Sequence, residues 1–141
     1  MKKWLRGLAV VLVLGAFLSG FAYPSLAGAA GTSSVYWSGS GILHPGESME
    51  SGKVLLPSGE KVLKITQIAS GRDGEDPWQG SYTIELMNRR GEVVDSCIGD
   101  NYNFQTTGMC YFEDLRRGSY SVKITNLSAP EMNVISATLR D

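Results

Sequence analysis

Beyond the first thirty residues, the hydrophobic positions of the chain fall in short alternating runs rather than at helical spacing. The clearest run is 81–87, in which Tyr82, Ile84 and Leu86 alternate with polar or small residues. A period of two is typical of a strand that buries one face. The run therefore predicts a strand whose Tyr82, Ile84 and Leu86 side chains face a core.

Similar runs recur, separated by segments rich in Gly, Pro, Asn and Asp. The predicted strands are 35–43, 53–56, 61–68, 81–87, 92–98, 104–112, 120–124 and 132–139. Pro57-Ser58-Gly59 has the composition of a tight turn, so the strands on either side of it are expected to pair as a hairpin. Tyr36 and Trp37 should point to opposite faces of the first strand, which places one in the core and leaves the other exposed.

About eight short strands with regular turns favour an all-β fold, an antiparallel β-sandwich of jelly-roll-like or immunoglobulin-like arrangement. Consecutive antiparallel strands alternate in direction, so every second connection emerges at the same end of the sandwich. The polar segments 70–80 and 99–103 are therefore expected to be loops at one end. The turn at 88–91 should lie at the other.

Residues 1–30 have a different pattern. Lys2, Lys3 and Arg6 precede an apolar run over 7–22, and small residues follow. This order is typical of a secretory signal peptide. A membrane anchor is the alternative, but the run is shorter than the roughly 20 apolar residues of a spanning helix. The sequence predicts a cleaved signal helix over 1–30 and a single secreted domain over 31–141, exported from a bacterium and in contact with the membrane only during export.

The chain has two cysteines, Cys97 and Cys110, both in the part predicted to be exported. Outside a reducing cytoplasm an even number of cysteines indicates a disulfide bond. The alternative is a pair of buried free thiols. Because the spacing is not C-x-x-C, a catalytic redox role is not expected.

Charge and residue inventory exclude several function classes. Loss of residues 1–30 leaves ten basic against 14 acidic residues, a balance that argues against a nucleic-acid partner. His44 is the only histidine and lies in a Pro-Gly turn, and no G-x-S-x-G motif or set of zinc ligands is present. We expect a protein that is not an enzyme and has no cofactor, unless calcium binds.

The end of the sandwich that holds 70–80 is the candidate binding surface, because long loops in compact domains are often functional. An exposed aromatic ring can stack on a sugar while carboxylate and amide groups bond its hydroxyls. The candidate ligand-binding residues are Trp78, Tyr102, Asp73, Asp76, Asp100 and Asn101. Calcium is a weaker candidate at Asp73, Glu75 and Asp76, whose spacing is not that of an EF-hand. A solvated acidic loop, with Trp78 covering the core edge, is the third alternative.

Several segments carry a resemblance to a known family. The stretches 82–86 and 91–94, and the segment 112–124 that leads Gly-x-Tyr into a strand, resemble secreted β-sandwich domains of the bacterial pre-peptidase C-terminal type. The likeness covers about residues 82–139, although no peptidase is attached and the two cysteines are not part of the pattern. It implies a non-catalytic accessory or binding domain and transfers no functional residues.

Together these observations predict a secreted, non-catalytic β-sandwich that binds an extracellular protein or polysaccharide. The alternative is more specific: a carbohydrate-binding module that uses Trp78 and Tyr102.

Overall fold

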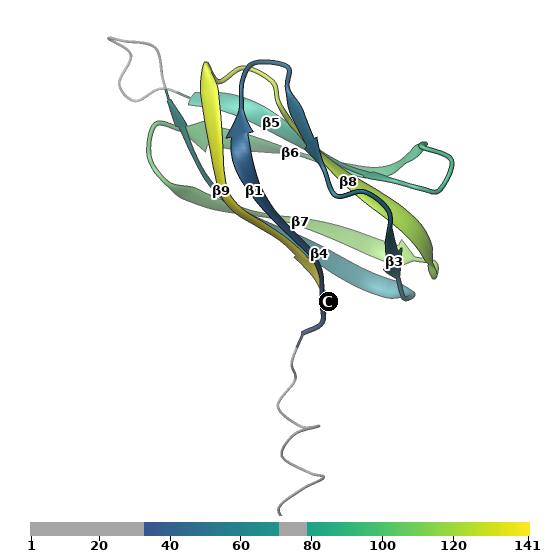
Figure 1. The fold of residues 1–141 in the computed structure, drawn as a ribbon. Coiled ribbons are helices and arrows are strands. Elements are labelled where there is room, and N and C mark those ends of the chain that lie inside the picture. The colour runs from purple at the N-terminus through teal and green to yellow at the C-terminus, as the bar shows by residue number, and fades with distance from the viewer. Residues whose placement is uncertain (1–32, 71–78) are drawn as a thin grey trace, which may run out of the picture. The chain divides into compact units, whose positions relative to one another are not determined.

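Two antiparallel sheets pack face to face in a computed structural model, which describes residues 33–70 and 79–141 (Figure 1). The strands of the described part are β1 (Val35–Leu43), β2 (Ser48–Glu50), β3 (Val54–Leu56), β4 (Gly59–Ser70), β5 (Gln79–Met87), β6 (Val93–Tyr102), β7 (Thr106–Leu115), β8 (Gly118–Asn126) and β9 (Glu131–Arg140). The all-β sandwich predicted from the alternation is confirmed.

The strand order places β6 and β7 at the edges of the two sheets. One sheet runs β1-β9-β4-β7, and the other runs β2-β8-β5-β6 with β3 also paired to β8. The chain therefore leaves the second sheet at the end of β6 and enters the first at β7. The disulfide Cys97–Cys110 joins these two edge strands, with their Cα atoms 5.9 Å apart, so the predicted bond is confirmed.

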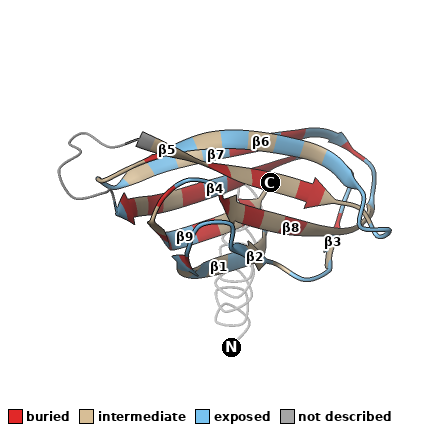
Figure 2. Ribbon diagram, turned by 90° about the horizontal axis from the view of Figure 1, so that it is seen from above, coloured by how far each residue is buried: buried red, intermediate tan, exposed pale blue. Residues whose placement is uncertain are grey.

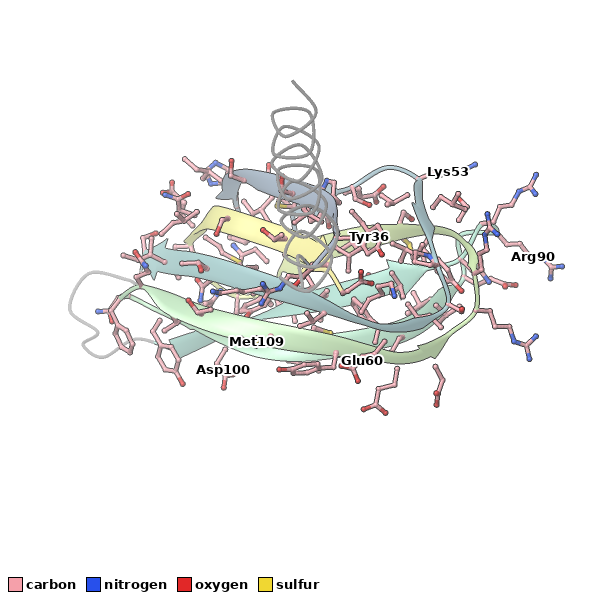
Figure 3. The ribbon with its side chains drawn as sticks, turned by 90° about the horizontal axis from the view of Figure 1, so that it is seen from below. Tyr36, Lys53, Glu60, Arg90, Asp100 and Met109 are labelled. Atoms are coloured by element: carbon pink, nitrogen blue, oxygen red, sulfur yellow. A yellow bond between two sulfur atoms is a disulfide. The ribbon has the colours of Figure 1, made fainter. Side chains whose placement is uncertain are left out.

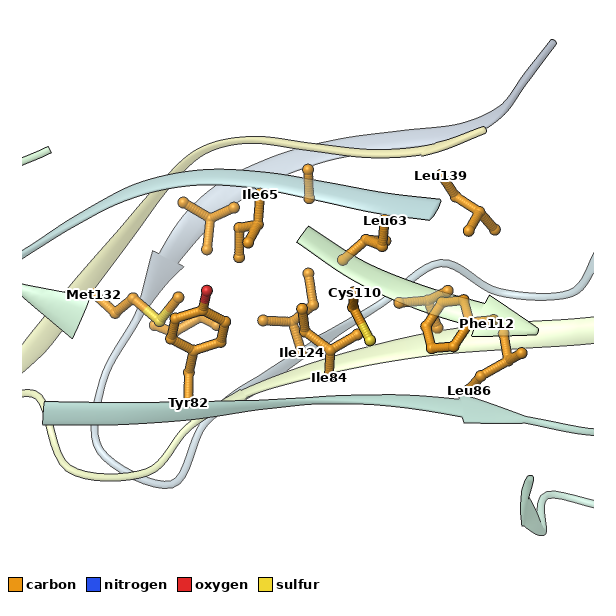
Figure 4. Close-up of a cluster of buried hydrophobic side chains, with 14 of the residues drawn as sticks. Leu63, Ile65, Tyr82, Ile84, Leu86, Cys110, Phe112, Ile124, Met132 and Leu139 are labelled. Atoms are coloured by element: carbon orange, nitrogen blue, oxygen red, sulfur yellow. The ribbon is translucent and has the colours of Figure 1, made fainter. Parts of the chain in front are cut away.

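The core lies between the sheets and takes its side chains mostly from alternate positions of the strands (Figure 2). Tyr82, Ile84 and Leu86 of β5 are all buried, as their spacing predicts. They face Leu63 and Ile65 of β4 across the sandwich (Figure 4). Burial of this apolar surface is the main contribution to folding stability.

A fully buried amide fixes the connection between β8 and β9. Asn126 Nδ2 donates hydrogen bonds to the carbonyl oxygens of Leu43 at 3.0 Å and Ala129 at 2.8 Å, and its Oδ1 accepts one from the Ala129 N–H. One side chain therefore joins the end of β1, the end of β8 and the loop before β9. These bonds satisfy backbone groups that are cut off from water.

A buried lysine joins the start of β4 to the end of the chain. Lys61 is 2% exposed, and its Nζ lies 3.0 Å from Asp141 Oδ1. The Tyr36 hydroxyl donates to the same carboxylate, and the ammonium lies 5.7 Å from the centre of the Tyr36 ring. This hydrogen bond and the ion pair stabilise the ionised carboxylate, and the pKa of Asp141 is lowered chiefly by Lys61 and then by Tyr36.

The predicted hairpin around Pro57-Ser58-Gly59 is wrong. β3 pairs with β8 in one sheet, whereas β4 pairs with β7 and β9 in the other. Gly59 does adopt a positive φ of 111°, as expected of a glycine in a tight turn. The turn carries the chain from one sheet to the other instead of joining two neighbours.

The expectation for Tyr36 and Trp37 is also wrong. Both are half-buried and both pack against the core. The cause is a shift in the pairing of β1 with β9 between Val35 and Trp37, where an irregularity breaks the strict alternation of faces.

The predicted signal helix lies outside the described residues. Those residues contain no helix long and apolar enough to cross a membrane.

Candidate functional site: a groove between two sheet edges

A groove that combines aromatic and polar groups lies between β6 and β7, the neighbouring edge strands of the two sheets. It encloses about 300 Å³. Tyr82 and Ile84 of β5 line it from the inside, and its walls come from β6 and β7. The larger side chains of the walls are those of Ile98, Asp100 and Tyr102 on β6, and of Thr106, Thr107 and Met109 on β7. Asp100 and Met109 lie on the same side of the molecule (Figure 3).

The disulfide links the two walls of the groove. Cys97 and Cys110 both line it, and Cys110 is 1% exposed. Because the bond joins the two sheets directly, it restrains the distance between the walls in a way that hydrogen bonding within either sheet does not.

Beyond the disulfide, two glycines make room for one aromatic ring. Gly99 of β6 is the cross-strand partner of Tyr82, and Gly108 lies on β7 in the opposite sheet. A Cβ at Gly108 would lie 2.7 Å from the Tyr82 hydroxyl oxygen, and one at Gly99 would overlap the ring itself. The Tyr82 ring therefore reaches across the sandwich from β5 towards β4 (Figure 4).

Burial and a nearby carboxylate keep the Tyr82 hydroxyl neutral. The side chain is 3% exposed, and burial, followed by the charge of Asp100, raises the pKa of Tyr82 above that of an ordinary tyrosine. A neutral hydroxyl both donates and accepts hydrogen bonds. Asp100 adds an acceptor, so the groove offers donors and acceptors next to apolar surface.

An aromatic pair adjoins the groove, because Tyr102, one of its lining residues, stacks on Phe104. The rings of Tyr102 and Phe104 stack with their centres 5.0 Å apart and an angle of 13° between their planes. Phe104 lies in the turn between β6 and β7 and is 52% exposed. Such a pair presents a flat apolar surface beside the polar groups of Asp100 and Thr106.

The sequence-predicted site residues have different outcomes. Asp73, Glu75, Asp76 and Trp78, the calcium candidates among them, lie outside the described residues. Asp100 and Tyr102 both line the groove. The predicted loop over 99–103 is largely strand, because β6 continues to Tyr102.

Asn101 does not face solvent, contrary to the loop expectation. It is fully buried on the inner face of β6, and neither atom of its amide has a hydrogen-bond partner among the described residues. Alternation along β6 explains the difference, since Asp100 and Tyr102 lie on the opposite side of the strand from Asn101.

The register places the end of β4, the start of β5 and the turn between β6 and β7 at one end of the sandwich. Gln79, which begins β5, pairs with Tyr102 at the end of β6, and Gln67 near the end of β4 pairs with Thr106 at the start of β7. The segment between β4 and β5 therefore starts and finishes beside the groove.

Sequence reasoning missed Ile98 and Tyr82 as groove residues, and Phe104 as the ring that stacks on Tyr102. Ile98 is 76% exposed, an unusual position for an isoleucine within a strand. A signal for Tyr82 was present: glycines at 99 and 108 lie on the core-facing side of strands, where a neighbouring ring can fill the missing volume.

Comparisons with known proteins support the fold. No family model matches the chain, and no curated protein does. Among solved structures it is similar to the C-terminal CBM6 of LamC, a marine laminarinase from Zobellia galactanivorans, at 12% identity and a TM-score of 0.52, over 78% of this chain and 100% of that one. It is also similar to a CBM35 from Cellvibrio japonicus Abf62, at 12% identity and a TM-score of 0.51, over 77% and 92%.

CBM denotes a carbohydrate-binding module. A further structure, described as "CBM4 structure and function", matches at 10% identity and a TM-score of 0.51, over 79% of this chain and 83% of that one. Such identities establish architecture alone, so the resemblance to pre-peptidase C-terminal domains is supported only as far as the β-sandwich. The chain has a β-sandwich fold that it shares with carbohydrate-binding modules.

Proposed function

We propose that this chain is a secreted, non-catalytic carbohydrate-binding module that holds a polysaccharide in the groove between β6 and β7. The observation that carries the proposal is that Tyr82, Asp100 and the half-buried Tyr102 line one groove, while Tyr102 stacks on the exposed ring of Phe104. Sugars present apolar C–H faces and polar hydroxyl rims, so they bind where flat aromatic surface adjoins hydrogen-bonding groups.

The surrounding fold supports this proposal. The solved structures most relevant to it are themselves named as carbohydrate-binding modules of a laminarinase and other proteins. The site lies on β6 and β7, which the disulfide joins, so the binding groups stand on rigid elements.

Trp78 belongs to the proposed site on sequence grounds. It directly precedes Gln79, whose Cα pairs with that of Tyr102. A tryptophan there would extend the aromatic surface. Export through the predicted signal peptide would bring the module to extracellular polysaccharide.

The test is co-sedimentation of residues 31–141 with bacterial cell walls, cellulose, xylan and insoluble β-1,3-glucan. We expect saturable binding to at least one, weakened about tenfold in Phe104→Ala and in Tyr102→Ala through loss of stacking. Tyr111→Ala is the matched control, because Tyr111 is 53% exposed, against 52% for Phe104, but belongs neither to the groove lining nor to the Tyr102–Phe104 pair.

The co-sedimentation results can also contradict the proposed site or the proposed function. Binding that is unchanged in both groove variants and lost in Trp78→Ala would move the site to the 70–80 segment. Absence of binding to every polysaccharide would overturn the proposal and favour a protein partner.

A further inference from the structure

A second hollow lies on the outer face of the β1-β9-β4-β7 sheet, facing away from the core. It encloses about 270 Å³. Its lining is made of Val35, Lys64, Thr66, Ser136, Thr138 and Arg140. Two cations and three hydroxyls thus converge on one patch of sheet, which we call the cationic face.

The register brings the two cations together. Lys64 of β4 pairs with Thr138 of β9, and Arg140 is two residues beyond Thr138 on the same face. Diagonal neighbours of this kind lie within reach of each other's long side chains. One ligand group can therefore contact both the ammonium and the guanidinium.

Neither cation has an acidic partner in the described part of the chain. Within residues 33–70 and 79–141 the ion pair present is Lys61–Asp141, and it involves neither of them. The cross-strand neighbours of Lys64 are Met109 and Thr138, both uncharged. Arg140 Nε is buried and has no hydrogen-bond partner in the described part of the chain.

Lys123, unlike Lys64, has acidic residues as its cross-strand neighbours. It lies on the other sheet, between Glu85 of β5 and Glu50 of β2 as its cross-strand partners. Opposite charges at such positions stabilise a sheet. Two adjacent unpaired cations cost stability instead, unless a ligand supplies the negative charge.

We infer that the cationic face is a binding site for the carboxylate of an anionic polysaccharide, held by Lys64 and Arg140. A planar carboxylate matches the two-pronged geometry of a guanidinium. Thr66, Ser136 and Thr138 supply hydroxyls for the hydroxyl groups of the same sugar. The anion requirement stands on the cationic face alone, whereas the polysaccharide nature of the ligand rests on the proposed function.

A nucleic acid or anionic membrane fits this patch less well. Such partners are bound through many phosphate contacts, and the exported chain has more acidic than basic residues. A site with two cations and three hydroxyls is suited to one charged sugar unit.

Isothermal titration calorimetry with trigalacturonate and its methyl ester tests the inference. We expect trigalacturonate to bind more tightly than the uncharged ester, and added salt to weaken its binding. Lys64→Gln and Arg140→Gln should each lower its affinity about tenfold or more, through loss of a charge-assisted hydrogen bond. Lys123→Gln is the matched control and should bind as the unaltered protein does.

Dextran sulfate, compared with dextran, distinguishes a sulfate ester from a carboxylate as the source of the anion. Loss of its binding in Lys64→Gln and Arg140→Gln would support the site with sulfate as the anion. Equal affinity in those variants and the control, for both ligands, would overturn the inference.

A doubly substituted Tyr102→Ala, Phe104→Ala protein separates this inference from the proposed function. Trigalacturonate binding that persists in that protein and is lost in Arg140→Gln places the anion on the cationic face, whether or not the groove binds sugar. Trigalacturonate binding that is lost in the double variant and kept in Arg140→Gln would place the anion in the groove and overturn the inference.

Discussion

Tyr82 and Gly99 are cross-strand partners, and the Tyr82 ring occupies the volume in which a side chain at position 99 would lie. Gly99→Ala should therefore destabilise the fold by about 1–3 kcal/mol, the usual range for overpacking. Gly41→Ala is the control, because a Cβ at Gly41 would meet nothing within 4 Å. Urea unfolding followed by tryptophan fluorescence measures both.

A second substitution tests whether the Tyr82 ring causes the destabilisation expected for Gly99→Ala. If the ring is responsible, Gly99→Ala should cost much less stability in a Tyr82→Ala background, and the double-mutant cycle should show a coupling energy of about 1 kcal/mol or more. Additive effects would mean that the strain arises elsewhere.

Acid should weaken the fold through Asp141. Its pKa is lowered in the folded protein, first by Lys61 and then by Tyr36, so the ionised carboxylate contributes stability above the ordinary aspartate pKa. That contribution disappears as the pH falls through the ordinary value and then through the lowered one. Asp141→Asn should remove this part of the acid dependence, as thermal unfolding across the acidic range would show.

Substitution of Lys61, the ion-pair partner of Asp141, should have a different effect on stability. Lys61→Met replaces a buried ammonium by an apolar side chain of similar length and leaves Asp141, whose side chain is 44% exposed, in contact with water. Because solvent can compensate the carboxylate but not the buried ammonium, we expect Lys61→Met to be less destabilising at neutral pH than Asp141→Asn. The reverse order would contradict this account of the ion pair.

Removal of the disulfide should lower stability by about 3 kcal/mol on the chain-entropy account, given the 13-residue separation of Cys97 and Cys110. Guanidinium unfolding of the Cys97→Ala, Cys110→Ala protein, and of the reduced native protein, measures the effect. Amide hydrogen exchange should also rise in β6 and β7 more than in β8, because the bond joins the two edges. Uniform exchange across the sheets would show that the bond does not restrain the groove.

Strand identity could be predicted from local pattern, since Tyr82, Ile84 and Leu86 face the core as their spacing indicates. Strand pairing could not. The Pro57-Ser58-Gly59 turn looks the same whether it joins two neighbours or crosses between sheets, because the choice depends on contacts with β8 and β9 that are distant in sequence.

The candidate site was predicted in part for the same reason. Asp100 and Tyr102, predicted from the alternation of strand directions and the polar segment 99–103, do line the groove. The burial of Asn101 between them follows from the continuation of β6 to Tyr102, which the polar residues of this segment did not indicate. Lys64 and Arg140 are 76 positions apart, so their convergence depends on the pairing of β4 with β9.

The buried amide of Asn126 restricts the hosts in which this protein can be produced. Asn126-Leu127-Ser128 is an acceptor sequence for N-linked glycosylation, and the glycan would be attached through Nδ2. In the folded chain that atom donates to the carbonyls of Leu43 and Ala129 and has no access to solvent. A chain glycosylated there in a eukaryotic secretory pathway could not close the junction of β1, β8 and β9, whereas a bacterial host without that modification leaves it intact.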